Sequence, residues 1–239
     1  EAVREGLRRA EKDLNIRCGI IICGIRNINP ETSLRLADIA VQFKNKGVVG
    51  FDLAGLEENF PAKHHREAFY MILNNNVNAT IHAGEAFGPE SIHQAIHYCG
   101  AHRIGHGTRL REDRGLMQYV NDHRITLEAC LTSNYHTKSI RSLRYHPAKY
   151  YYEQGLRITL NTDNRLISDT TLTDEFMLAQ KLFNFNLYDF REITITGMKS
   201  AFLHYKERKE MIKAIADELE GDFGLIPEYF PSDLTARAS

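Results

Sequence analysis

Short apolar runs alternate with amphipathic segments along most of the chain. Several runs are almost continuously hydrophobic, such as Ile20-Ile21-Ile22 and Val48-Val49-Gly50-Phe51. Such runs are typical of strands that are buried on both faces of a sheet. The pattern predicts strands over residues 16–24, 47–55, 78–83, 102–107, 124–132 and 155–162.

Helical segments are predicted between these strands. In residues 33–46, apolar side chains recur at helical spacing with charged residues between them. Further helices are predicted over residues 61–74 and 89–99. Pro89 is well placed in the first turn of its helix. Residues 1–15 are charged and helical in character, and two more helices are predicted over residues 191–202 and 204–220.

Strands that alternate with helices predict a parallel α/β sheet with right-handed crossovers. An open doubly wound sheet would place a site at a switch point, usually with a glycine-rich phosphate loop, and the sequence has no such loop. A TIM-type (β/α)8 barrel collects polar residues from the ends of several strands on one face. We therefore favour an incomplete barrel in a single domain over residues 1–239, with about six strands and a helical C-terminal region from about residue 187. Either the two front strands are missing or two strands have gone unrecognised.

Bulk properties exclude some classes of partner. The 239 residues are 43% hydrophobic and 26% charged, and the formal net charge is −1. Neither nucleic acid nor an anionic membrane surface is expected to attract such a chain, and no apolar run approaches the length of a membrane span. The four cysteines fit neither a zinc clip nor a disulfide framework, so we expect reduced thiols and a cytoplasmic location.

Four polar residues stand at the downstream ends of predicted strands: His82, Glu85, His106 and Asp163. Singly, each has a plain structural explanation: a histidine satisfied by a hydrogen bond, or an aspartate that caps a helix. Together they provide two imidazoles and two carboxylates at one end of a parallel sheet, which indicates a functional site.

This set of side chains suits metal-dependent hydrolysis. Imidazole and carboxylate ligands bind Zn²⁺, which lowers the pKa of a bound water to about 7. We predict His82 and Asp163 as ligands, His106 as the base beside the water, and Glu85 as the acid. Such a site would hydrolyse an amidine-type carbon, including the carbon that carries the amino group of a purine.

Several motifs occur in an order and spacing that resemble the adenosine deaminase family, especially its bacterial branch. The resemblance spans about residues 1–205. Its motifs are Gly50-Phe51-Asp52-Leu53-Ala54-Gly55, His82-Ala83-Gly84-Glu85, Arg103-Ile104-Gly105-His106-Gly107, Ser133-Asn134, His146-Pro147 and Asn161-Thr162-Asp163-Asn164.

The resemblance implies a role for each matching residue. His82 and Asp163 would be zinc ligands, Glu85 would protonate purine N1, and His106 would orient and deprotonate the attacking water. Gly55 would donate its backbone N–H to purine N3. Asn164 would donate to N7, which its amide can do at any pH. Asp52 would orient a zinc ligand or His106 through a hydrogen bond to the side of the ring that faces away from the metal.

The same resemblance implies zinc-dependent deamination of adenosine or 2′-deoxyadenosine in purine salvage, with a small purine nucleoside as the partner. Gly105 stands where adenine-specific relatives tend to carry aspartate, which favours a nucleoside over the free base. A deaminase of adenine or of a modified adenine nucleoside is the alternative.

One element of the family pattern has no match. The family takes two more zinc ligands from a His-x-His on its first strand, and this sequence has none; His64-His65 lies on a predicted helix. We therefore expect the chain to be part of a longer enzyme. On its own it should bind zinc weakly, lack activity, and self-associate or pair through exposed sheet edges. An inactive fragment that needs a second segment is the remaining alternative.

Overall fold

The computed structural model describes residues 1–223. The chain forms two compact units, Glu1–Leu116 and Met117–Ser239. The prediction of a single domain over residues 1–239 stays a prediction, and its part beyond residue 223 lies outside the described residues. Within those residues, no helix is both long enough and apolar enough to cross a membrane.

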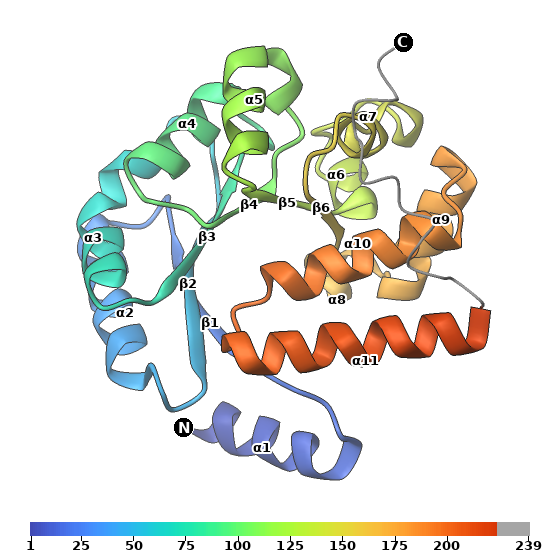
Figure 1. The fold of residues 1–239 in the computed structure, drawn as a ribbon. Coiled ribbons are helices and arrows are strands. Elements are labelled where there is room, and N and C mark those ends of the chain that lie inside the picture. The colour runs from blue at the N-terminus through green and yellow to red at the C-terminus, as the bar shows by residue number, and fades with distance from the viewer. Residues whose placement is uncertain (224–239) are drawn as a thin grey trace. The chain divides into compact units, whose positions relative to one another are not determined.

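The first unit is built on four parallel strands that lie side by side in chain order (Figure 1). They are β1 (Ile20–Ile25), β2 (Val48–Ala54), β3 (Asn78–Ala83) and β4 (Arg103–His106). The helical elements are α1 (Ala2–Leu14), α2 (Pro30–Phe43), η1 (Ala62–His65), α3 (Arg66–Asn74), α4 (Pro89–His97) and η2 (Leu110–Glu112). Helices α2, α3 and α4 lie along one side of the strands.

The core of this unit lies between the strands and those three helices. Phe51 on β2 packs edge to face against Phe69 on α3, with ring centroids 5.3 Å apart. Ile81 on β3 and Ile92 on α4 have no exposed surface. These apolar contacts fix the strands, and therefore fix where their carboxyl ends lie.

The second unit has two parallel strands, β5 (Thr126–Ala129) and β6 (Ile158–Leu160). Helix α5 (Arg114–Asp122) runs across the boundary between the units. Helix α10 packs on β6 and on α11. The helical elements of this part are α6 (Leu131–His136), η3 (Leu143–Tyr145), α7 (Ala148–Glu153), α8 (Arg165–Ser168), α9 (Leu172–Phe183), α10 (Leu187–Ser200) and α11 (Tyr205–Phe223).

All six predicted strands are present. Strands β2, β4, β5 and β6 have narrower bounds than the apolar runs, β3 has the predicted bounds, and β1 begins four residues later and ends one residue later than predicted. The last predicted helices, 191–202 and 204–220, also occur, but the first of them begins at Leu187. Its start is set by Asn186, whose side chain accepts from the N–H groups of Tyr188 and Asp189, while Asp189 accepts in return from the Asn186 N–H. Helices α5 to α9 are not among the predicted elements. Three of them, α6, α7 and α8, have six residues or fewer and show no apolar periodicity.

Candidate active site

Three of the predicted site residues and a supporting aspartate come together at one end of the strands of the first unit. Asp52 lies on β2, His82 on β3, His106 is the last residue of β4, and Glu85 is in the loop after β3. Residues 80–83 of β3 pair in parallel with residues 103–106 of β4, so that His82 is opposite Gly105. The parallel register therefore brings the two histidines to the same edge of the sheet.

The ring of His82 is oriented by Asp52. Its Nδ1 lies 3.1 Å from Asp52 Oδ1, and the Asp52 side chain is only 12% exposed. This contact commits Nδ1 to a carboxylate and makes Nε2 the ring nitrogen that would face a metal ion. A histidine ligand held from behind by a carboxylate is a recurring arrangement in metal sites. The supporting role of Asp52 at a metal ligand stays a prediction.

Cys23 on β1 completes the surroundings of Asp52. Its thiol donates to Asp52 Oδ2 at 3.7 Å, because β1 pairs with β2 so that Cys23 is opposite Asp52. Burial and the nearby Asp52 carboxylate raise the pKa of the Cys23 thiol to about 12. The thiol therefore remains a neutral donor at physiological pH.

His106 and Glu85 form the second pair. His106 Nε2 lies 3.4 Å from Glu85 Oε2, and the His106 side chain is 2% exposed against 21% for Glu85. The rings of His82 and His106 stand edge to face with their centroids 5.0 Å apart. Imidazole and carboxyl are thus placed to exchange protons with a molecule lying beside His82.

The backbone of His106 adopts a left-handed conformation, with φ of 66°. This conformation is costly for a residue with a side chain and is concentrated at functional sites. Gly105 makes room for the neighbouring ring: a Cβ at this position would lie 3.2 Å from His82 Cα and 3.3 Å from His82 Cγ. The surrounding structure therefore holds His106 in a strained backbone conformation, and the glycine before it leaves room for the ring of His82.

Asp163 and Asn164 belong to the second unit, just after β6. Asp163 is exposed, has φ of 55°, and accepts a hydrogen bond of 2.6 Å from the Ser133 hydroxyl. Asn164 is exposed and caps α8, where its Oδ1 accepts from the Ile167 N–H at 3.2 Å. The meeting of Asp163 with His82 stays a prediction.

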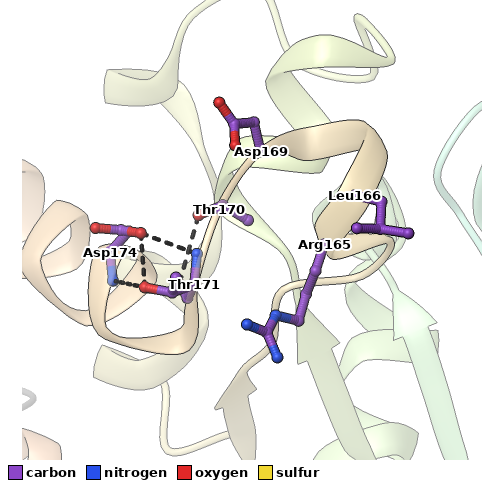
Figure 2. A pocket seen from close by; sticks show the side chains of 6 residues that line it. All are labelled: Arg165, Leu166, Asp169, Thr170, Thr171 and Asp174. Carbon is purple, nitrogen blue, oxygen red and sulfur yellow. Dashed lines mark hydrogen bonds between the residues drawn. The ribbon is translucent and has the colours of Figure 1, made fainter.

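A pocket of about 550 Å³ adjoins this segment. Its lining residues come from α8, from the turn that follows and from the start of α9 (Figure 2). Thr171 and Asp174 are joined by reciprocal hydrogen bonds that start α9. The lining residues are Arg165, Leu166, Asp169, Thr170, Thr171 and Asp174.

Gly55 directly follows β2 and is exposed. Two residues further on, Glu57 is buried, and its carboxylate accepts hydrogen bonds from the N–H groups of residues 84–87. In the second unit, the fully buried Glu175 accepts from the N–H groups of Leu131 and Thr132 at 2.8 and 3.2 Å. The sequence analysis does not single out either glutamate, because each belongs to an ordinary run of polar residues.

The two predicted zinc ligands belong to different units. Asp52 orients the ring of His82 in the first unit, and Asp163 is an exposed carboxylate in the second. Among residues 1–223, no three histidine, cysteine, aspartate or glutamate side chains are grouped so that they could hold a metal ion. Catalytic zinc sites use three protein ligands, and the described residues do not group three such side chains in one place.

Residues 1–218 match the family model for adenosine deaminase. The chain belongs to the adenosine deaminase family. A probable adenosine deaminase of Dictyostelium discoideum is 40% identical over 203 residues, which cover 85% of this chain and 26% of that protein. An adenosine deaminase of Mycobacterium ulcerans is 42% identical over 194 residues, which cover 77% of this chain and 54% of that protein. The chain therefore spans at most about half the length of these two relatives.

Solved structures show the same fold. An adenine deaminase of Arthrobacter aurescens superimposes with a TM-score of 0.85 at 20% identity, covering 91% of this chain and 66% of that one. An amidohydrolase of Burkholderia ambifaria with bound zinc gives a TM-score of 0.82 at 19% identity, covering 92% of this chain and 64% of that one. These likenesses confirm the predicted fold class, an α/β fold of parallel strands that corresponds to part of a deaminase barrel.

Proposed function

We propose that this chain forms the larger part of the catalytic barrel of a zinc-dependent adenosine deaminase. Its substrates would be adenosine and 2′-deoxyadenosine, and its place would be purine salvage in the cytoplasm. The observation that carries the proposal is the adjacency of two pairs, Asp52 with His82 and His106 with Glu85, at one end of the strands. The family to which the chain belongs supports the same reaction.

In the proposed reaction, water adds to C6 of the purine and ammonia leaves, which gives inosine. Glu85 gives a proton to N1 as water attacks, so that the ring does not accumulate negative charge. His106 orients the water and accepts its proton. His106 then gives that proton to the amino group, which leaves as ammonia, while the C6 hydroxyl gives its proton to the Glu85 carboxylate as the C6 carbonyl of inosine forms. Their separation of 3.4 Å suits such an exchange.

Four further residues would hold the purine and its activating metal. Gly55 would donate its N–H to N3, and Asn164 would donate its amide to N7. His82 and Asp163 would be two of the zinc ligands, and the metal supplies activation of the attacking water when it is bound.

Further zinc ligands would come from the rest of the longer polypeptide. Because zinc normally has at least three protein ligands at such sites, the isolated 239-residue chain should hold zinc weakly and deaminate adenosine slowly or not at all. Equilibrium dialysis of the isolated chain against zinc, followed by metal analysis, tests the first statement. Stoichiometric, tightly held zinc in the isolated chain would contradict it.

The proposal is tested on the zinc-loaded longest natural polypeptide that contains this chain. Adenosine consumption is followed by its ultraviolet spectrum for the wild type, Glu85→Gln and, as a matched control, Glu58→Gln at an exposed site in the same unit. We expect Glu85→Gln to lower kcat by about 10²–10⁴-fold without loss of zinc, and the control to match the wild type. A wild type that does not deaminate adenosine refutes the proposal.

A second substrate class also has support. Solved structures with this fold include the adenine deaminase above and an N6-mAMP deaminase of Arabidopsis, which has a TM-score of 0.82 at 25% identity over 90% of this chain and 66% of that one. Comparing kcat/KM for adenosine, adenine and N6-methyladenosine separates the possibilities. A larger value for adenine or the methylated nucleoside would favour the second class.

A further inference from the structure

The loop that follows β3 is held by a single buried carboxylate. Glu57 Oε2 accepts from the N–H groups of Glu85, Ala86 and Phe87 at 3.0, 2.6 and 3.0 Å, and its Oε1 accepts from Gly84 at 2.5 Å. The Glu57 residue is 7% exposed. Successive backbone N–H groups that point to one place form a natural anion-binding concavity. Here the anion is a side chain of the protein itself.

A buried arginine fixes the other end of the same segment. Arg26 is 2% exposed; its Nη2 donates to the carbonyl of His82 and its Nη1 to the carbonyl of Phe60 at 3.2 Å. Glu57 is an electrostatic partner of Arg26 and favours its charged form, whereas burial lowers the pKa of the guanidinium. The two opposite charges are therefore buried close to each other.

Arg26 and Glu57 hold the segment 82–87 from both ends. The carbonyl of His82 is fixed by Arg26, and the N–H groups beginning two residues later are fixed by Glu57. Glu85 lies between these anchors, and its own N–H is one of the four that Glu57 accepts. The direction in which the Glu85 side chain leaves the backbone is thereby set, and that side chain reaches His106.

We propose that Glu57 is a positioning residue for the deamination reaction: its carboxylate fixes the 84–87 loop so that the Glu85 carboxyl meets His106 and the substrate. This inference rests on the proposed function for its catalytic consequence. Its structural part, the hold on the loop, stands independently of the reaction. Because its carboxylate is occupied by four backbone N–H groups, Glu57 would act on the reaction through Glu85.

The test compares Glu57→Gln, Glu57→Asp and the matched control Glu58→Gln in the zinc-loaded longest natural polypeptide. Glutamine keeps the shape of the side chain but replaces one acceptor oxygen by a donor and removes the charge. Aspartate keeps the carboxylate and shortens its reach. Glu58 is the adjacent residue of the same type and is exposed.

Two readouts are measured. Hydrogen exchange of the amides at 84–87 should accelerate at least tenfold in Glu57→Gln and stay unchanged in Glu58→Gln, because buried acceptors protect the amides they bind. In the same variant kcat should fall about tenfold or more while KM changes less than threefold, since a small misplacement of a reacting group is costly to the chemical step. Glu57→Asp should recover part of kcat.

The outcomes separate the two proposals. The inference is overturned if folded Glu57→Gln keeps wild-type amide exchange rates and wild-type kcat. It is also overturned if kcat falls and KM rises by the same factor in both Glu57 variants, because that result indicates a merely structural role. If Glu57→Gln does not fold, the same readouts on Glu57→Asp decide. If the wild type lacks deaminase activity, the proposed function fails, and the exchange rates alone decide whether Glu57 holds the loop.

Discussion

Replacing Gly84 by alanine should destabilise the first unit markedly. Gly84 lies between His82 and Glu85 with φ of 70°, a conformation that costs about 1–2 kcal/mol for a residue with a Cβ. The new Cβ would lie 2.5 Å from Cδ1 of Ile92. Because Ile92 is fully buried, it has little room to move, and overpacking of this kind costs about 1–3 kcal/mol. The free energy of unfolding should fall by roughly 2–5 kcal/mol in sum.

Urea denaturation followed by circular dichroism measures this change, and Gly115→Ala is the matched control. Gly115 lies in α5 at ordinary φ, and a Cβ there meets nothing closer than Asp113 Oδ1 at 3.5 Å. The control should therefore be neutral or stabilising by about 0.4–1 kcal/mol. Adding Ile92→Val to Gly84→Ala removes the nearer clashing carbon, Cδ1, and leaves Cγ1 at 2.8 Å. The clash is partly relieved, so the double variant should be more stable than the sum of the single changes. A change of less than about 0.5 kcal/mol in Gly84→Ala would refute the reasoning.

Three further outcomes are expected. Asp52→Asn removes the carboxylate that contacts His82 Nδ1, and it should weaken zinc binding by the longest natural polypeptide about 10–100-fold in a chelator competition. A variant that binds zinc as tightly as the wild type would contradict the supporting role of Asp52. Because its pKa is raised to about 12, Cys23 should have roughly one thiolate in 10⁴ at pH ~8 and be alkylated by iodoacetamide far more slowly than Cys18, as peptide mass spectrometry can show. Burial lowers the pKa of His65 below 6.5, so the unfolded chain takes up the proton first and the free energy of unfolding should decrease as pH falls below about 6.5. Urea titrations above and below pH ~6.5 measure this pH-dependent change in the free energy of unfolding. The change should be smaller in His65→Gln than in the wild type, and an equal change in both would show that His65 is not its source.

The strands of the fold could be predicted because their signal is local. A strand buried on both faces must be apolar along its length, and runs such as Ile20-Ile21-Ile22 have no other simple explanation. The bounds could not be predicted as well. Residues 155–162 read as one strand, whereas only Ile158–Leu160 are in β6, because strand ends depend on hydrogen bonds to a neighbouring chain segment.

Part of the candidate site could be predicted from the sequence for the same reason. Functional residues of parallel α/β folds follow the strands, so His82 and His106 could be selected from their place after apolar runs. The contact of His82 with Asp52 depends on which strands are neighbours and on their register. The pairing of His106 with Glu85 depends on the course of a loop. Neither is encoded in a local pattern.

Local sequence patterns are enough to predict the alternation of strands and helices, the family, and the histidines and carboxylates that are candidates for chemistry. They cannot distinguish Glu57 from Glu58, which are adjacent and chemically identical, whereas the fold does. One is buried and accepts four backbone N–H groups, and the other is exposed. The physical reason is that burial and hydrogen bonding are set by segments distant in the chain, here the loop after β3, which no local pattern around residue 57 can reveal.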